Sequence, residues 1–182
     1  MGSPKPLLPL GNSTYIETIL ATLSRARVHP VVVVLGHEAP RVQAEAGLGA
    51  AQVLVNDAWA EGMLSSLQSA VRALEGDPGV GGLLVALVDS PRFSHATVRA
   101  LEHAWGTSSA KIVVPAYDRR HGHPVIFDRS LWPALLAAAP ERGARAVVDA
   151  HRSGLVEVPV DDPWVLRDAD TPAEHRRMLD GR

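Results

Sequence analysis

The sequence predicts an α/β protein with a Rossmann-like, mostly parallel sheet that helices cover on both faces. Apolar, β-branched runs alternate along the chain with segments whose apolar residues recur at helical spacing. The connections between the apolar runs are long enough for right-handed crossovers. A length of 182 residues suits one domain with a sizeable core, so residues 1–182 are expected to form a single domain.

The first half of the chain alternates helix and strand. The expected elements are a helix at 12–26, a strand at 30–36, a helix at 39–48, a strand at 52–56, a helix at 62–74 and a strand at 82–89. Asn12 or Ser13 is expected to cap the first helix, because its side chain accepts a hydrogen bond from a free backbone N–H group. The helix at 62–74 is expected to bury the face formed by Met63, Leu67, Ala70, Val71 and Leu74.

The second half continues the alternation. The expected elements are a helix at 94–105, a strand at 110–117, a short strand at 123–127, helical stretches at 131–139 and 144–151, a strand at 155–160 and a helix at 171–179. Pro172 suits the first turn of the last helix. The glycine-rich segment 75–82 precedes a strand and does not open a helix, so a surface turn is favoured over a phosphate loop.

Composition excludes several classes of protein. A net charge of −2 provides no basic face for nucleic acid. The chain has no cysteine, which excludes disulfides, thiolate zinc sites and cysteine nucleophiles. No run reaches the roughly 18 apolar residues that span a bilayer, and no signal-peptide pattern opens the chain. A cytoplasmic protein without nucleic-acid or membrane partners is therefore expected.

Ligands of open α/β sheets bind beyond the carboxyl ends of the strands, and this rule draws attention to Asp89. Asp89 ends an apolar run, where a carboxylate is well placed to hold Mg²⁺ against substrate phosphates. Capping of the helix that begins near Ser94 is the alternative, and it carries equal weight. Asp168 and Asp170 precede the last helix, where each is a candidate second metal ligand and a candidate helix cap.

Other candidate residues also have structural alternatives. Gly62 opens a helix whose first N–H groups could receive a ribose or a phosphate, or could form only a tight turn. The segment RRHGHPVIF contains a His-x-His pair that lacks a third zinc ligand at metal spacing. Arg142 and Arg145 could contact an anionic substrate or belong to a solvated turn. Lys5, one of two lysines in the chain, could meet a triphosphate or stay solvated.

Six segments occur in the order of one known family: MGSPKPLLPLG, NDAWAEGMLSSLQ, LVDSP, PAYDRRHGHPVIF, ERGAR and VEVPVDDPWVLRDADTP. Over essentially its whole length the chain resembles the molybdenum-cofactor nucleotidyltransferases, most closely the molybdenum cofactor cytidylyltransferase type. The resemblance implies a Mg²⁺-dependent enzyme with a fold similar to the nucleotide-diphospho-sugar transferases. Such an enzyme joins CMP from CTP to the phosphate of the molybdopterin cofactor and releases pyrophosphate. A molybdoenzyme or its chaperone is the protein partner that the resemblance implies.

The same resemblance implies roles for particular residues. Lys5 would be catalytic by neutralising triphosphate charge, and Asp89 and Asp170 would bind Mg²⁺. The acceptor substrate would be contacted by His123 and Arg145. Contacts to the nucleotide would come from Gly2, Lys5, Gly62, Met63, Ser65 and Ser66.

The family signature begins with a strand and a loop of the form Leu-Ala-Ala-Gly-x-Ser-x-Arg-Met-Gly-x-Pro-Lys, whose last part is matched by the opening MGSPK. The resemblance implies that the first strand and the glycine-rich loop are missing, through a start codon assigned to an internal methionine or through a genuine truncation. The missing strand would lie beside 30–36 and 82–89. Without it we expect exposed strand edges, marginal stability and little affinity for Mg·CTP.

One further departure concerns the nucleotide base. Ser90 stands where the family has glutamine in Asp-Gln-Pro, which keeps the metal ligand and removes an amide side chain. The preference for CTP over GTP therefore rests on overall similarity. Two rival hypotheses stay open: a catalytically silent cofactor-binding protein that lacks the nucleotide loop, and a related transferase that uses GTP or another phosphorylated acceptor.

Overall fold

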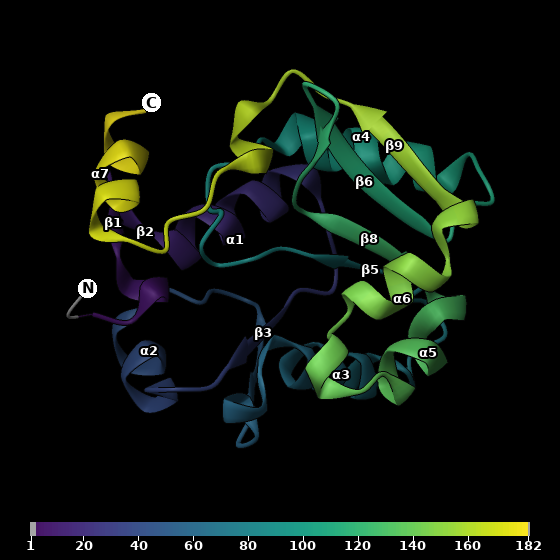
Figure 1. The fold of residues 1–182 in the computed structure, drawn as a ribbon. Helices are drawn as coiled ribbons and strands as arrows, with labels where there is room; N and C mark the ends of the chain where they lie inside the picture. The colour runs from purple at the N-terminus through teal and green to yellow at the C-terminus, as the bar shows by residue number, and fades with distance from the viewer. Residues whose placement is uncertain (1–2, 182) are drawn as a thin grey trace.

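The computed structural model describes residues 3–181 and confirms the predicted α/β class (Figure 1). Its α-helices are α1 (Tyr15–Ala26), α2 (Ala39–Glu45), α3 (Met63–Leu74), α4 (His95–Gly106), α5 (Trp132–Ala137), α6 (Arg145–Ala150) and α7 (Pro172–Asp180). Its strands are β1 (Pro9–Leu10), β2 (Ser13–Thr14), β3 (Val32–Leu35), β4 (Gln52–Val55), β5 (Gly82–Val85), β6 (Ile112–Tyr117), β7 (Arg120–His121), β8 (Val125–Asp128) and β9 (Leu155–Pro159). Among the short 3₁₀ turns are η1 (Lys5–Leu7), η2 (Trp59–Glu61) and η6 (Pro163–Leu166). No helix of this range is long and apolar enough to cross a membrane.

The strands form three hydrogen-bonded groups. β1 and β2 make a short antiparallel hairpin, and β3 pairs in parallel with β4. A five-stranded sheet has the order β5-β8-β6-β7, with β9 parallel to β6. Because β8 runs antiparallel to both β5 and β6, these two strands point in the same direction. The central strands are therefore mostly parallel, as predicted, and β8 is the antiparallel insertion.

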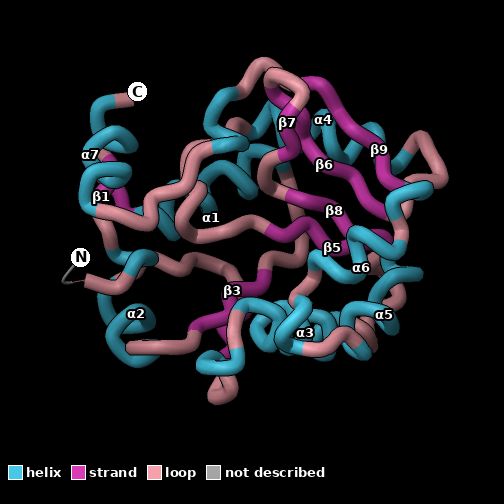
Figure 2. The backbone as a smooth tube through the Cα atoms, in the orientation of Figure 1, coloured by secondary structure: helices cyan, strands magenta, loops and turns pink. Residues whose placement is uncertain are grey.

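Helices cover the strands on two sides (Figures 1 and 2). On one side, α1 packs against α4, and Leu23 and Val98 belong to the same buried cluster. On the other, α3 packs against α5, and Leu67, Leu135 and Ile112 share a larger buried cluster. The core is thus divided into layers above and below the strands, as in other helix-covered sheets.

A groove separates β3 from β5. It has a volume of about 570 Å³ and follows both strands from their amino ends to Asp89. Apolar side chains of α1 and α3 line its two sides, including Ile19 and Leu67. Within residues 3–181, β3 pairs with β4 alone and β5 with β8 alone, so the strand edges that border the groove have no ladder partner.

The prediction for the cap of the first helix is wrong. Thr14 caps α1: its side chain accepts a hydrogen bond from the Glu17 backbone N–H, and its own N–H donates to Glu17 Oε2 at 2.8 Å. This capping box needs a glutamate three residues after the cap, which selects Thr14 over Asn12. Ser13 lies one residue before the cap position and pairs with Leu10 in the hairpin.

Two other expectations need correction. Met63 lies on the outside of α3 with 61% of its surface exposed, while Leu64 is buried and takes its place on the inner face. The strand predicted at 82–89 ends at Val85, and a turn follows at Val88–Asp89. Asp89 consequently lies on the loop beyond the strand and not in the sheet itself.

Candidate functional site

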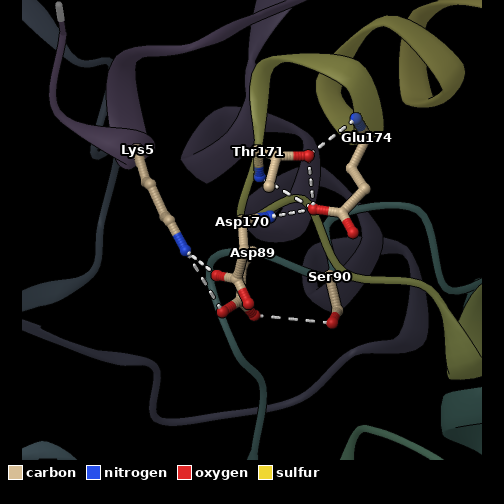
Figure 3. Close-up of polar contacts among 6 residues, drawn as sticks. All are labelled: Lys5, Asp89, Ser90, Asp170, Thr171 and Glu174. Carbon is tan, nitrogen blue, oxygen red and sulfur yellow. Dashed lines mark hydrogen bonds and ion pairs between the residues drawn. The ribbon is translucent and has the colours of Figure 1, made fainter. Parts of the chain in front are cut away.

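Three charged side chains from distant parts of the chain meet at one edge of the structure (Figure 3). Lys5 comes from η1, Asp89 from the loop after β5, and Asp170 from the segment before α7. The Lys5 ammonium lies 3.6 Å from Asp89 Oδ2 and also contacts Asp170 Oδ1. The structure therefore brings together Lys5, Asp89 and Asp170, the three residues that the resemblance assigned to triphosphate and metal.

Backbone contacts explain why the two carboxylates converge. The Ala169 N–H donates to the Asp89 carbonyl at 3.0 Å, which fastens the segment before α7 to the loop after β5. Thr171 caps α7 in a capping box with Glu174, whose carboxylate also accepts from the Asp170 N–H. Since Thr171 fills the cap position, the Asp170 carboxylate is left to face Lys5. The alternative of Asp170 as a helix cap is thus not observed.

The position of α7 is held by two further contacts. Arg92, which follows the Asp89 turn, donates from Nη1 to the Met178 carbonyl at 2.7 Å. The Tyr15 hydroxyl at the start of α1 lies 2.7 Å from His175 Nδ1. These contacts connect α7 to the two elements that flank Lys5, so Asp170 is presented on a fixed support.

Asp89 does not cap the helix after it. The Ser94 hydroxyl accepts a hydrogen bond from the Thr97 N–H at 3.0 Å and occupies the cap position of α4. The buried Asp162 carboxylate accepts from the Ser94 N–H at 2.7 Å. The only side-chain hydrogen bond that the described residues give Asp89 besides its contact with Lys5 is a long one of 3.5 Å from Ser90.

The Lys5 side chain stays protonated at neutral pH. Burial alone would lower the pKa of Lys5, but the hydrogen bond to Asp170 and the charges of Asp89 and Asp170 raise it above its ordinary value. The Asp89 side chain is 26% exposed and that of Asp170 62% exposed, so the cluster opens to solvent on one side. The structure thus places the Lys5 ammonium between two carboxylates that solvent can reach.

These carboxylates suit a divalent metal. Mg²⁺ is typically bound by one or two carboxylates together with substrate phosphates and waters. Residues 3–181 contain no group of three or more His, Cys, Asp or Glu side chains placed to hold a metal ion. A metal held by Asp89 and Asp170 would take its other ligands from substrate or water. The Lys5 ammonium already shows that the space between Asp89 and Asp170 accepts positive charge.

The loop that leads into α3 is built around a buried asparagine. Asn56 donates from Nδ2 to Ser65 Oγ at 2.8 Å and to Ser66 Oγ at 3.0 Å, and its Oδ1 accepts from the Ala58 N–H. Gly62 has φ 102° and ψ 179°, a conformation that is essentially restricted to glycine. The Ser65 hydroxyl is used inside the loop, since it donates to the Gly62 carbonyl at 2.8 Å.

Apart from Lys5, which is described above, the predicted nucleotide-binding residues divide into three groups. Met63 and Ser66 line the same groove as Asp89, so the structure brings these three together. Gly62 and Ser65 shape the loop without lining that groove. Gly2 lies outside the described residues.

His123 is half-buried and lies close enough to Asp89 and Asp168 for their charges to act on its ring. Its backbone N–H donates to the Val165 carbonyl at 2.9 Å, and its Nδ1 is buried without a hydrogen-bond partner among the described residues. Gly122 is needed here because a Cβ would stand 2.1 Å from the same carbonyl oxygen. Burial lowers the pKa of His123, and the charges of Asp89 and Asp168 oppose that shift only in part. A neutral imidazole therefore stands near the two acidic loops.

We expect His123 to make folding stability decrease as the pH falls. In the unfolded chain its pKa is near 6.5, and in the folded protein it is lower. The unfolded chain therefore binds a proton at His123 more readily than the folded protein does. The contribution of His123 to the free energy of unfolding is complete above about pH 6.5 and is lost as the pH falls toward the pKa of His123 in the folded protein. As the pH is lowered from about 7 to about 5, the urea concentration at the midpoint of unfolding should decrease. It should decrease less in His123→Gln than in the native chain.

His121 provides the matched control for this measurement. It is two residues away, its side chain is 45% exposed, and its Nε2 lies 2.7 Å from Glu157 Oε1. His121→Gln should keep the pH dependence that the His123 imidazole produces. An unchanged pH dependence in His123→Gln would show that this residue does not titrate as described.

Other predicted residues lie elsewhere or were missed. Arg145 begins α6, is 87% exposed in its side chain and pairs with Asp149 at 3.9 Å. In Figure 1, α6 lies beside α5, away from η1 and α7, so the structure does not bring Arg145 to the Lys5 cluster.

Sequence reasoning missed Asn56, whose position at the end of the expected strand 52–56 was the available signal.

An exposed aromatic pair was also missed. Trp59 is 45% exposed, and its ring meets that of His37 edge to face at 5.0 Å between centroids. Gly36 permits this approach, because a Cβ there would stand 2.4 Å from the Trp59 Cβ. The pair lies just beyond the carboxyl ends of β3 and β4, on the side of the sheet where ligands of this architecture bind.

Comparison with known proteins finds relatives that match nearly the whole chain. The family model described as the MobA-like NTP transferase domain matches residues 1–173. A nicotine blue oxidoreductase from Paenarthrobacter nicotinovorans is 33% identical over 97% of this chain and 88% of its own length. The crystal structure of Rv0371c from Mycobacterium tuberculosis H37Rv has a TM-score of 0.88 at 28% identity, covering 99% of this chain and 90% of that one. A manganese complex of Rv0371C has a TM-score of 0.84 at 28% identity, covering 98% and 93%.

Proposed function

Since this chain belongs to the MobA-like NTP transferase domain family, we propose that it transfers CMP from CTP to the phosphate of the molybdopterin cofactor and releases pyrophosphate. The convergence of Lys5, Asp89 and Asp170 is the observation that carries the proposal. A molybdoenzyme would be the recipient of the product. The family match shows that the chain is nucleotidyltransferase-like. The choice of CTP as donor and of the molybdopterin cofactor as acceptor is what we propose.

The cluster supplies what phosphoryl chemistry needs. Asp89 and Asp170 would hold Mg²⁺, which when bound neutralises charge on the triphosphate. Lys5 would leave its carboxylate partners for the triphosphate and compensate the negative charge that accumulates on it. An oxygen of the acceptor phosphate attacks the α-phosphorus in line, the bond from that phosphorus to the bridging oxygen breaks, and pyrophosphate leaves. Positioning and charge neutralisation carry the rate, so no covalent nucleophile is required.

The other residues of the site would bind the two substrates. Met63 and Ser66 line the groove that reaches Asp89, which supports a role in nucleotide contact, and the Asn56 network would keep their loop in shape. We assign His123 to the acceptor side, because its neutral imidazole lies near the charged cluster. Arg145 is left out of the proposed site, since it lies at α6.

The test is pyrophosphate release from CTP and from GTP in the presence of molybdenum cofactor. With an amino-terminal strand and glycine-rich loop added, we expect release from CTP to be faster than release from GTP, whereas the chain as given should show little release. A clear preference for GTP would move the chain to guanylyl transfer. No release from either nucleotide in both versions would favour the catalytically silent cofactor-binding protein.

A second candidate function is oxidoreduction of nicotine blue. Its support is the 33% identity to a protein of that name and the exposed pair of Trp59 and His37, which offers a face to a planar heteroaromatic molecule. Consumption of NADH or NADPH in the presence of nicotine blue, followed by absorbance, tests it. Turnover of the nicotinamide that requires nicotine blue and is lost in Trp59→Ala would establish this activity in place of nucleotidyl transfer.

A further inference from the structure

A small cavity lies between η6 and α7, next to the Lys5 cluster but outside it. Its volume is about 160 Å³, and Lys5, Asp89 and Asp170 are not among its lining residues. Pockets for drug-sized ligands measure roughly 300–1,000 Å³, so this space is too small for a nucleotide. It corresponds to roughly five water molecules at the volume that each has in the liquid. A ligand of this cavity must therefore be a small molecule or ion.

The two elements that border the cavity are fixed in place. The Asp162 carboxylate is buried, and it accepts hydrogen bonds from the Trp164 N–H at 3.1 Å and from the Ser94 N–H at 2.7 Å, which holds η6 against the start of α4. The Arg92 guanidinium lies 4.4 Å from the centre of the Trp164 ring and donates to the Met178 carbonyl, which holds α7 beside η6. A preformed cavity of this kind needs little reorganisation to bind a ligand.

Two arginines that line the cavity have no partner among the described residues. Within residues 3–181, the arginines that form ion pairs or side-chain hydrogen bonds are Arg41, Arg92, Arg129, Arg145 and Arg152. Arg167 and Arg177 are not in this group, although both face the same cavity. A guanidinium carries five N–H donors and no acceptor, in a fork that matches the oxygens of phosphate and carboxylate groups. The donors of this cavity therefore suit an oxyanion.

Two carboxylates also line the cavity, and neither forms an ion pair with these arginines. Glu174 is used in the cap of α7, where its Oε2 accepts from the Asp170 N–H at 3.0 Å and from the Thr171 N–H at 2.8 Å. Asp168 takes no part in the ion pairs of residues 3–181. Its negative charge opposes an anion in the cavity, so its removal should strengthen anion binding.

We propose that the cavity between η6 and α7 binds a small oxyanion of the phosphate class, held by the guanidinium groups of Arg167 and Arg177. The apolar part of the lining, Trp164, Leu166 and Met178, limits access of water and so strengthens the attraction between the arginines and the anion. Arg167 lies three residues before Asp170, and Arg177 lies on the helix that follows it. A bound anion thus joins the two segments that flank Asp170. This site does not depend on the proposed nucleotidyl transfer.

The experiment is a calorimetric titration of the full chain with orthophosphate, without divalent metal and at constant ionic strength set with sodium chloride. We expect saturable binding that becomes at least about tenfold weaker in Arg167→Gln and in Arg177→Gln, because each loses a charge-assisted hydrogen bond. Asp168→Asn should bind phosphate a few-fold more tightly than the native chain. The matched control is Arg176→Gln, which removes the exposed neighbour of Arg177 that does not line the cavity and should leave the affinity unchanged.

Lys5→Ala separates this site from the charged cluster. Orthophosphate should bind Lys5→Ala as it binds the native chain, and pyrophosphate titrated into the same variant shows whether the cavity also takes a diphosphate. Binding of either anion that requires Arg167 and Arg177 supports the proposal. Absence of saturable binding to the native chain overturns it, as does equal weakening in Arg176→Gln and Arg177→Gln. Binding that is lost in Lys5→Ala and kept in both Arg167→Gln and Arg177→Gln would place the anion at the Lys5 cluster, which also overturns the proposal.

Discussion

Replacing Asp89 by asparagine is expected to reduce divalent-metal-dependent nucleotidyl transfer by roughly 10²–10³-fold, the loss typical of removing one preorganised electrostatic group. The amide cannot neutralise a divalent cation, and Asp170, which is 62% exposed in its side chain, would remain as the single carboxylate ligand. Asp89 lies on a turn after β5, so the melting temperature should stay close to that of the native chain. Initial rates of pyrophosphate release at saturating Mg²⁺ and CTP, with the amino-terminal strand and glycine-rich loop added to both native and variant chains, measure the effect.

Two variants control this prediction. Asp170→Asn should lose as much activity or less, because a second ligand shares the charge of the metal with Asp89 and the substrate oxygens. Asp168→Asn removes an exposed carboxylate from the same segment, one for which the structure gives no contact with Lys5, and should retain most activity. Turnover of Asp89→Asn within a few-fold of the native rate would remove Asp89 from the mechanism.

The second large effect is expected at Lys5. Lys5→Ala removes the ammonium that would compensate triphosphate charge, and we expect a loss of roughly 10²-fold in kcat/KM for CTP. Lys5→Arg keeps the charge and should recover part of that loss. The only other lysine is the control: Lys111 lies 3.8 Å from Asp128 and is 47% exposed, so Lys111→Ala should leave turnover unchanged. Equal losses in Lys5→Ala and Lys111→Ala would indicate a general effect of charge.

The sequence allowed the alternation of elements and one half of the site to be predicted, because both follow from local patterns. The β-branched run at 30–36 is observed as β3, and the rule for carboxyl ends of strands led to Asp89. The contact between Lys5 and Asp170 joins residues 165 positions apart. Spacing cannot reveal such a pair, and only the resemblance to a known family connected them before the fold was seen.

The errors also have physical reasons. Periodicity allowed either Met63 or Leu64 on the inner face of α3, and packing against the core selected Leu64. The strand predicted at 82–89 ends early because β8 supplies hydrogen-bond partners only for Gly82–Val85. Nothing within the apolar run itself marks this end. Asn56 was overlooked because its role depends on hydrogen bonds to two serine hydroxyls, which only the turn at Gly62 brings within reach.

Nucleotidyl transfer at the site of Lys5, Asp89 and Asp170 can be followed with a radioactive label. The protein is incubated with Mg²⁺, molybdenum cofactor and CTP that carries ³²P at the α-phosphate, and the products are then separated. We predict that the label appears in the acceptor, with one pyrophosphate released for each labelled product, and that Asp89→Asn lowers both by roughly 10²–10³-fold. Label that stays in CTP or is recovered only as free CMP, with the amino-terminal strand supplied, would contradict the account.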